Sequence, residues 1–64
     1  MEKKYLVKKI LKLAELYNIK INIVKTTERL LGFSRLDLSD ITWFNKKEMQ
    51  QFLKGVNNKK GLQT

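Results

Sequence analysis

Apolar side chains recur at intervals of three and four residues in two stretches of this chain, one near its beginning and one near its end. The first stretch, residues 3–17, has Leu6, Ile10, Leu13, Ala14 and Tyr17 at helical spacing, with Val7 and Leu11 beside them. The second stretch has Met49, Phe52, Leu53 and Val56. This periodicity predicts amphipathic helices that bury one side. A chain of 64 residues without cysteine has no disulfide to stabilise it, so we expect these apolar sides to form its core. A basic amphipathic helix that lies on a membrane or in a partner's groove is the alternative for the first stretch.

Between these stretches, residues 13–31 have the spacing of two helices joined by a tight turn. Asn18 tolerates the left-handed conformation that commonly ends a helix, and Ile19 fills the turn. Asn22 is a good N-cap and Gly32 a good stop, which together predict a second helix over residues 22–31. Ile21 and its neighbouring isoleucines alternate with polar residues, so a strand is the alternative for this segment.

From residue 33 the apolar pattern changes to alternation. Leu36 and Leu38 alternate with polar residues, and a second apolar run follows Ser39-Asp40. This pattern predicts a two-stranded hairpin that packs on the helices. Asn45, with Glu48 three residues later, then predicts the N-terminus of a third helix. The expected fold class is therefore mostly α with a small β-hairpin (α+β), in one domain over residues 1–56 with a flexible basic tail over 57–64.

The chain has 14 basic and 6 acidic residues, a net charge of +8. Such a charge favours polyanionic partners, most obviously nucleic acid, although a lysine-rich surface also simply keeps a small protein in solution. Histidine and cysteine are absent, and the chain has neither a glycine-rich phosphate loop nor a close carboxylate pair with an obvious role. We therefore expect no metal, no other cofactor and no enzymatic activity.

The apolar runs are also much shorter than the roughly 20 residues of a membrane span. The first residues lead directly into the amphipathic pattern, which differs from a signal peptide with its apolar segment. We therefore expect a cytoplasmic protein that does not bind a membrane.

The second predicted helix carries the main candidate binding face. A helical wheel directs Ile23, Val24, Thr27, Leu30 and Leu31 toward the core. It directs Asn22, Lys25, Thr26 and Arg29 to the opposite side, with Lys20 just before them. These polar residue types bind base edges and phosphates, although any solvent-facing helix has a similar composition. Arg35 in the hairpin and Lys46 and Lys47 in the third helix complete the predicted DNA-binding set.

The segment AELYNIKINIV, Ala14 to Val24, resembles the start of the small winged helix-turn-helix family that includes phage excisionases and relatives of the MerR regulators. Ala14, Glu15, Leu16, Ile19 and Val24 are in register with that family's pattern, and Asn18 replaces its turn glycine. TWFNKKEMQQFL, residues 42–53, is similar to the family's closing segment, so the resemblance covers about residues 11–54. The acidic residues Asp37 and Asp40 depart from the basic wing that is usual in the family.

The resemblance implies a double-stranded DNA-binding protein with its second helix in the major groove and a wing near the minor groove. Members of the family act as excisionases, which are recombination directionality factors, or as small transcriptional regulators of a phage or mobile element. An integrase or recombinase partner and cooperative self-association on DNA are further implications of the resemblance.

A protein-binding module, such as a phage-encoded inhibitor of a host protein, is the rival hypothesis. Its contacts would be exposed apolar residues, namely Leu16, Ile21 and one of Trp43 and Phe44. Because adjacent strand residues point to opposite faces, we expect one of these two aromatic residues to close the core beside Phe52 and the other to be exposed. Stacking on single-stranded bases is the alternative for this pair.

Overall fold

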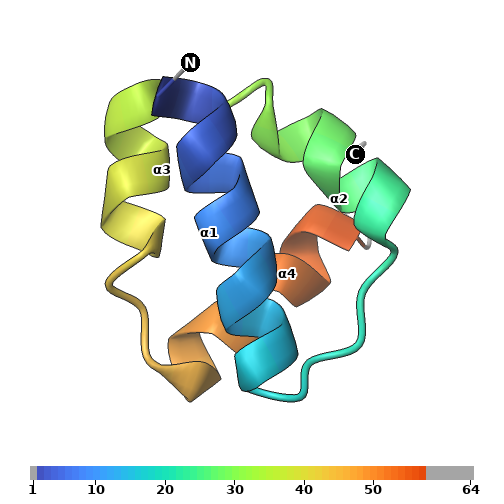
Figure 1. Ribbon diagram of the computed structural model, residues 1–64. Helices are drawn as coiled ribbons and strands as arrows, with labels where there is room; N and C mark the ends of the chain where they lie inside the picture. The colour runs from blue at the N-terminus through green and yellow to red at the C-terminus, as the bar shows by residue number, and fades with distance from the viewer. Residues whose placement is uncertain (1, 58–64) are drawn as a thin grey trace.

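Four α-helices make up the part of the chain that the computed structural model describes, residues 2–57. These helices are α1 (Glu2–Leu16), α2 (Ile23–Leu30), α3 (Arg35–Ile41) and α4 (Lys46–Asn57). Figure 1 shows α1 at the centre, with α2 and α3 on opposite sides of it and α4 crossing behind. The tail predicted over residues 57–64 lies outside the described residues, except that Asn57 ends α4.

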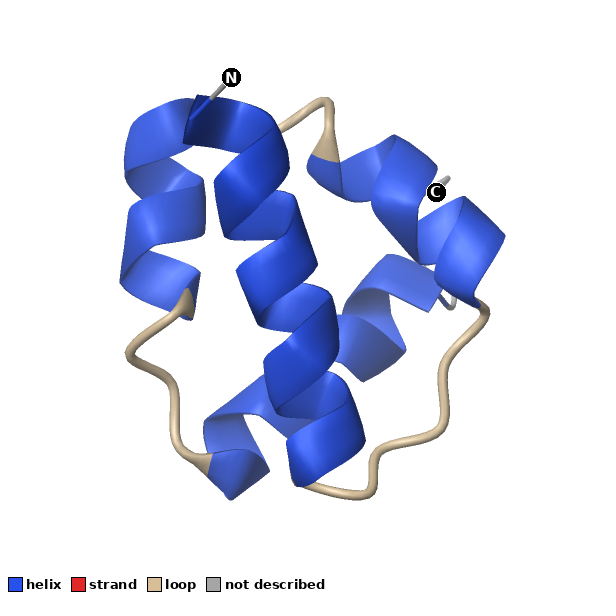
Figure 2. Cartoon of the chain, in the orientation of Figure 1, coloured by secondary structure: helices blue, strands red, loops and turns tan. Residues whose placement is uncertain are grey.

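The predicted hairpin is wrong, because residues 2–57 contain no strand and the segment after Gly32 forms α3 (Figure 2). Ser34 caps this helix, and its side-chain oxygen accepts a hydrogen bond from the Asp37 backbone N–H at 3.1 Å. Leu38 and Ile41, three residues apart, are the buried pair, whereas Leu36 is 76% exposed. The alternation of Leu36 with Leu38 was therefore too short to define a strand, and the cap together with the three-residue spacing favours a helix. The fold class is all-α and lacks a wing over these residues.

The predicted end of the first helix is confirmed in detail. Asn18 has a φ of 61°, in the left-handed region. The Ile19 N–H donates to the Ala14 carbonyl at 2.8 Å, and the Asn18 N–H donates to the Glu15 carbonyl at 3.0 Å. This pair of hydrogen bonds is the Schellman motif, which satisfies carbonyls at a helix C-terminus and reverses the chain. The turn thus directs the following residues back along α1 toward α2.

The predicted N-termini of α2 and α4 are also confirmed. The Asn22 side chain accepts a hydrogen bond from the Lys25 N–H at 3.0 Å. At α4, the Asn45 N–H donates to Glu48 Oε1 at 3.0 Å, and the Glu48 N–H donates back to Asn45 Oδ1 at 2.8 Å. This reciprocal capping box satisfies two backbone donors that the helix cannot satisfy itself.

The core lies on one side of α1, where the other three helices meet it. Buried apolar residues come from all four helices, as the periodicity of the two end stretches predicts: Val7, Ile10, Ala14, Leu30, Leu38, Ile41, Met49, Leu53 and Val56. Phe52 packs edge-on against Phe33 and Phe44, with ring centroids 5.6 and 6.0 Å apart. The Tyr17 hydroxyl donates to the Phe44 carbonyl at 3.2 Å, so the connections between helices are also held against the core.

Asn18→Ala should lower the free energy of unfolding by about 1 kcal/mol. Alanine has a Cβ that disfavours the left-handed conformation, and it lacks the polar side chain with which asparagine can form local hydrogen bonds there. Asn18→Gly, which adopts this conformation freely, should be neutral or slightly stabilising. Urea denaturation followed by circular dichroism measures both effects. Equal stability of the two variants would contradict the positive φ at this residue.

Candidate functional site

Two of the four residues on the predicted DNA-reading face of α2 are turned toward the end of α4 and not toward solvent. Thr26 is completely buried, and its hydroxyl donates to Asn57 Oδ1 at 3.0 Å. The Arg29 guanidinium donates to the Val56 carbonyl in the last turn of α4. Both side chains therefore bind the end of α4, and Ile23 and Val24, which the helical wheel directs inward, are 63% and 68% exposed. The helix is rotated about its axis relative to the prediction.

The remaining predicted contacts are exposed, but they do not form one face. These exposed residues are Lys20, Asn22, Lys25, Arg35, Lys46 and Lys47. Arg29 binds at the C-terminal end of α4, whereas Lys46 and Lys47 begin that helix, about 15 Å away along its axis. Arg35 begins α3, on the other side of α1 from α2 (Figure 1). The predicted set is therefore spread over four segments of the chain.

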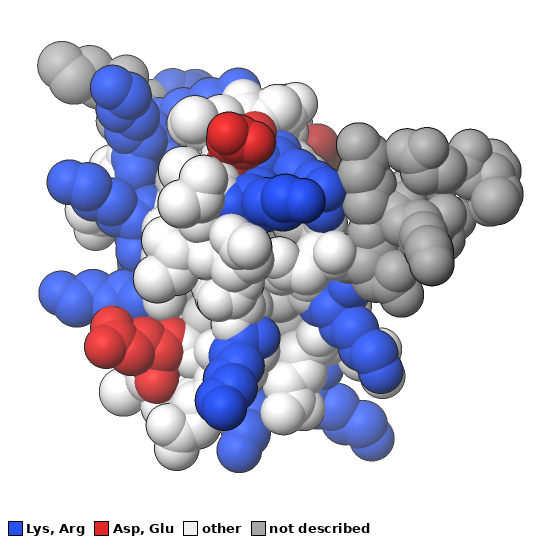
Figure 3. All heavy atoms as spheres, turned by 90° about the vertical axis from the view of Figure 1, so that its right-hand side faces the viewer, with Lys and Arg blue, Asp and Glu red and all other residues white. Residues whose placement is uncertain are grey.

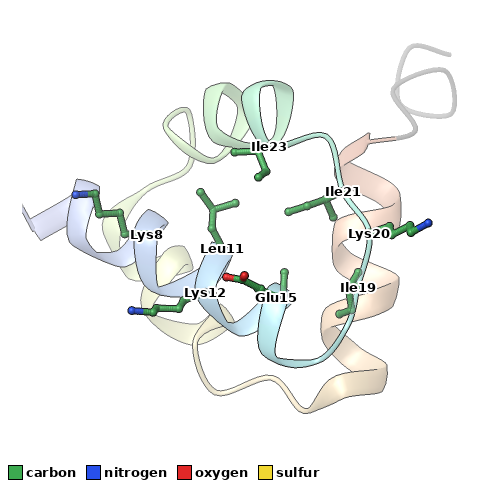
Figure 4. A pocket seen from close by; sticks show the side chains of 9 residues that line it. Lys8, Leu11, Lys12, Glu15, Ile19, Lys20, Ile21 and Ile23 are labelled. Carbon is green, nitrogen blue, oxygen red and sulfur yellow. The ribbon is translucent and has the colours of Figure 1, made fainter.

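An apolar groove lies instead between α1 and the chain that leads into α2. Its volume is about 660 Å³, and the apolar side chains that line it are Leu11, Ala14, Ile19, Ile21 and Ile23. Figure 4 shows Leu11, Ile21 and Ile23 pointing into the space between the two segments. We call this feature the α1–α2 groove. It is an exposed concave apolar surface, the kind of site at which proteins bind other chains or apolar ligands.

Charged side chains border the groove on both sides. Lys8, Lys12 and Glu15 project from α1, and Lys20 projects from the connecting segment (Figure 4). The border thus has three positive charges and one negative charge. Figure 3 shows a broad uncharged area on this side of the molecule, bordered mostly by lysine and arginine side chains and by fewer acidic ones.

The isoleucine alternation explains how the groove forms. Residues 17–22 connect α1 to α2 without regular structure, and Ile19 and Ile21 are both partly buried. In a locally extended chain, residues two apart point to the same side, so both isoleucines turn toward α1. The isoleucine alternation, for which a strand was the alternative prediction, therefore belongs to a connecting segment whose isoleucines form one side of the groove. The alternation was evident in the sequence, but the position of Leu11 on the opposite side of the groove was not predicted.

The exposed side of α1 is basic. Lys4, Lys8, Lys9 and Lys12 are all exposed, and we call these four residues the lysine face. Lys4, Lys8 and Lys12 follow at intervals of four residues, so they lie along one side of the helix. Two of them, Lys8 and Lys12, also border the α1–α2 groove.

Exposed apolar residues also occur outside the groove. Trp43 is 84% exposed, whereas Phe44 packs on Phe52, which confirms that one member of this pair closes the core. Leu16, another predicted protein contact, is 73% exposed at the end of α1. Ile21, the third predicted protein contact, is the one that lies in the α1–α2 groove.

The connection between α2 and α3 has the length of a helix-turn-helix turn, but these two helices lie on opposite sides of α1 and do not pack on each other as such a pair does (Figure 1). Helix-turn-helix pairs have connections of three or four residues that often contain glycine. Residues 31–34, with Gly32, join α2 to α3, whereas the longer segment 17–22 joins α1 to α2. However, α3 exposes Asp37 and Asp40, which would repel phosphates. The sequence signal for α3 is Ser34, which follows Gly32 and caps the helix. The hairpin prediction overlooked this cap.

Comparisons with protein-family models, with curated proteins and with solved structures find nothing that matches this chain. Within residues 2–57, none of the helices combines the length and the apolar character that crossing a membrane requires. In the same residues, no three His, Cys, Asp or Glu side chains come together in a group that could hold a metal ion.

Thr26→Val should lower the free energy of unfolding by about 1 kcal/mol, because it removes the buried hydrogen bond to Asn57. Lys25→Ala, at the neighbouring exposed residue, should alter the free energy of unfolding by less than about 0.5 kcal/mol. Urea denaturation of both variants tests the orientation of α2. If Thr26→Val changed the free energy of unfolding as little as Lys25→Ala, Thr26 would be exposed and α2 would have the orientation of the helical wheel instead.

Proposed function

We propose that the protein binds duplex DNA by holding its phosphate backbone with the lysine face of α1. The observation that carries this proposal is the row of exposed lysines at positions 4, 8 and 12, with Lys9 beside them. The net charge of +8 supports it, because the charge of the whole chain attracts a polyanion from a distance.

The spacing of the row suits a line of negative charges. Residues four apart on a helix are about 6 Å apart along its axis. Like charges at this spacing destabilise a helix by about 0.2–0.5 kcal/mol per pair. A phosphate backbone along the row would relieve this repulsion, and each neutralised phosphate would release bound counterions. Binding would therefore weaken strongly as the salt concentration rises.

We do not extend this proposal to base recognition by α2. Phosphate contacts position a protein on DNA, whereas contacts with base edges specify the sequence. Thr26 and Arg29, which were to read bases, form hydrogen bonds with the end of α4 instead. The excisionase and regulator roles that the resemblance implies come with a wing, which residues 2–57 lack, so they are not part of the proposal.

Replacement of Lys4, Lys8 and Lys12 by glutamine should weaken binding to a duplex of random sequence. The slope of log affinity against log salt concentration should fall by about 3, because about 0.9 counterion is released for each lost phosphate contact. Fluorescence anisotropy with a labelled duplex across a salt series measures this slope. Circular dichroism establishes that α1 remains helical in the variant.

The matched control replaces Lys25, Lys46 and Lys54, which are exposed lysines on α2 and α4. With glutamine at these three positions the variant loses the same charge as the test variant, and it also loses Lys25 and Lys46 from the predicted DNA-binding set. Its slope of log affinity against log salt concentration should nevertheless change by less than about 1. Equal losses in the two variants would mean that the protein attracts DNA by its total charge, and the lysine face would then have no special role.

A further inference from the structure

We infer that the α1–α2 groove binds an acidic amphipathic helix of a partner protein. The inference goes beyond DNA binding and does not depend on it. Three observations identify the occupant: the apolar lining of the groove, the net positive charge of its border and the lack, within residues 2–57, of a further helix that fits it.

The lining indicates that the occupant is apolar on the side that enters the groove. Leu11, Ile21 and Ile23 converge on the groove from α1, from the connecting segment and from the start of α2 (Figure 4). Ile23 remains 63% exposed in this chain alone, and a bound apolar side chain would cover it. Removal of such apolar surface from water favours binding.

The same lining favours a helix over an extended peptide. A helix pairs its backbone N–H and C=O groups internally, so it can enter an apolar groove without leaving them unpaired. An extended peptide that binds by strand addition needs an exposed sheet edge, and residues 2–57 contain no strand. A polyproline segment docks in a groove lined by aromatic side chains, and the lining of this groove has none. An amphipathic helix with apolar residues at positions i, i+3 or i+4, and i+7 is the established way to fill a groove of this kind.

The border determines the charge of the occupant. Lys8 and Lys12 lie along one side and Lys20 along the other, against the single carboxylate of Glu15. These lysines point outward from the rim of the groove in Figure 4, and their flexible side chains allow the ammonium groups to reach glutamate or aspartate residues that flank the apolar stripe of a bound helix. This complementarity raises the rate of encounter and selects against basic partners.

A second copy of this chain fits the groove poorly. Two molecules that each have a charge of +8 repel one another, and the exposed side of α1 is itself basic. The acidic helix α3 spans Arg35–Ile41, about 10 Å, and has Leu36 as its one strongly exposed apolar residue. It is too short to place a row of apolar side chains along the groove.

The test uses a synthetic probe helix of about four turns, with leucine at i, i+3 and i+7 positions and glutamate on its flanks. Isothermal titration calorimetry measures its binding to the full chain and to two variants. Ile23→Asp should weaken binding at least about ten-fold, because it puts a negative charge into the groove. Val24→Asp is the matched control, because it adds the same charge in the same turn of α2. Val24 is 68% exposed and lies outside the groove lining, so this change should alter the affinity by less than about two-fold.

A second pair of variants tests the border. Lys20→Glu should weaken binding of the probe more than Lys25→Glu, which reverses an equally exposed charge away from the groove. The inference is overturned if the probe does not bind, or if Ile23→Asp and Val24→Asp bind it equally well. It is also overturned if a scrambled peptide of the same composition binds as tightly as the probe. Sedimentation equilibrium addresses the other occupant, since self-association that Ile23→Asp abolishes would assign the groove to a second copy of the chain.

Discussion

The packing of α1 against the three shorter helices is the interaction on which the rest of the structure depends. Its buried residues Val7, Ile10 and Ala14 form one stripe, and α2, α3 and α4 all contact this helix. The other helices are 8, 7 and 12 residues long, which is too short for stability in water without tertiary contacts. Each of these three helices is therefore stable because tertiary contacts cover its apolar side, and all three have α1 as a packing partner.

The features that sequence reasoning predicted correctly are those that depend on neighbouring residues. The caps at Asn22 and Asn45 and the left-handed turn at Asn18 are short-range effects, because the groups that form the hydrogen bonds lie within about five residues of one another. The apolar stripes of α1 and α4 are long enough to have an unambiguous period. By contrast, the segment that became α3 has only Leu36, Leu38 and Ile41 to define its period, and these fit either a strand or a short helix. Ser34 was the local signal that distinguished the two.

The candidate site was less predictable than the fold, because the orientation of α2 is determined by distant residues. A helix of eight residues has few apolar side chains, so hydrogen bonds to distant residues can determine which side of it is buried. The hydrogen bonds from Thr26 and Arg29 to the end of α4 join residues about 30 positions apart in the chain, and no local pattern specifies them. They rotate Ile23 outward, and this rotation creates the α1–α2 groove. The lysine face of α1 was also missed, because the predicted binding residues lay mainly on the second helix, although the four-residue spacing of Lys4, Lys8 and Lys12 is a local signal for it.

The short connections of this fold have a consequence for how the chain reaches its native state. Residues 17–22, 31–34 and 42–45 join the helices, and most native contacts form within a helix or over a short distance in the chain. The packing of α3 on α1 and of α4 on α1 and α2 joins more distant segments. Helical proteins with such local contacts fold in microseconds to milliseconds. The chain contains no proline, so no slow isomerisation of a prolyl bond delays folding. Refolding should therefore follow a single fast phase.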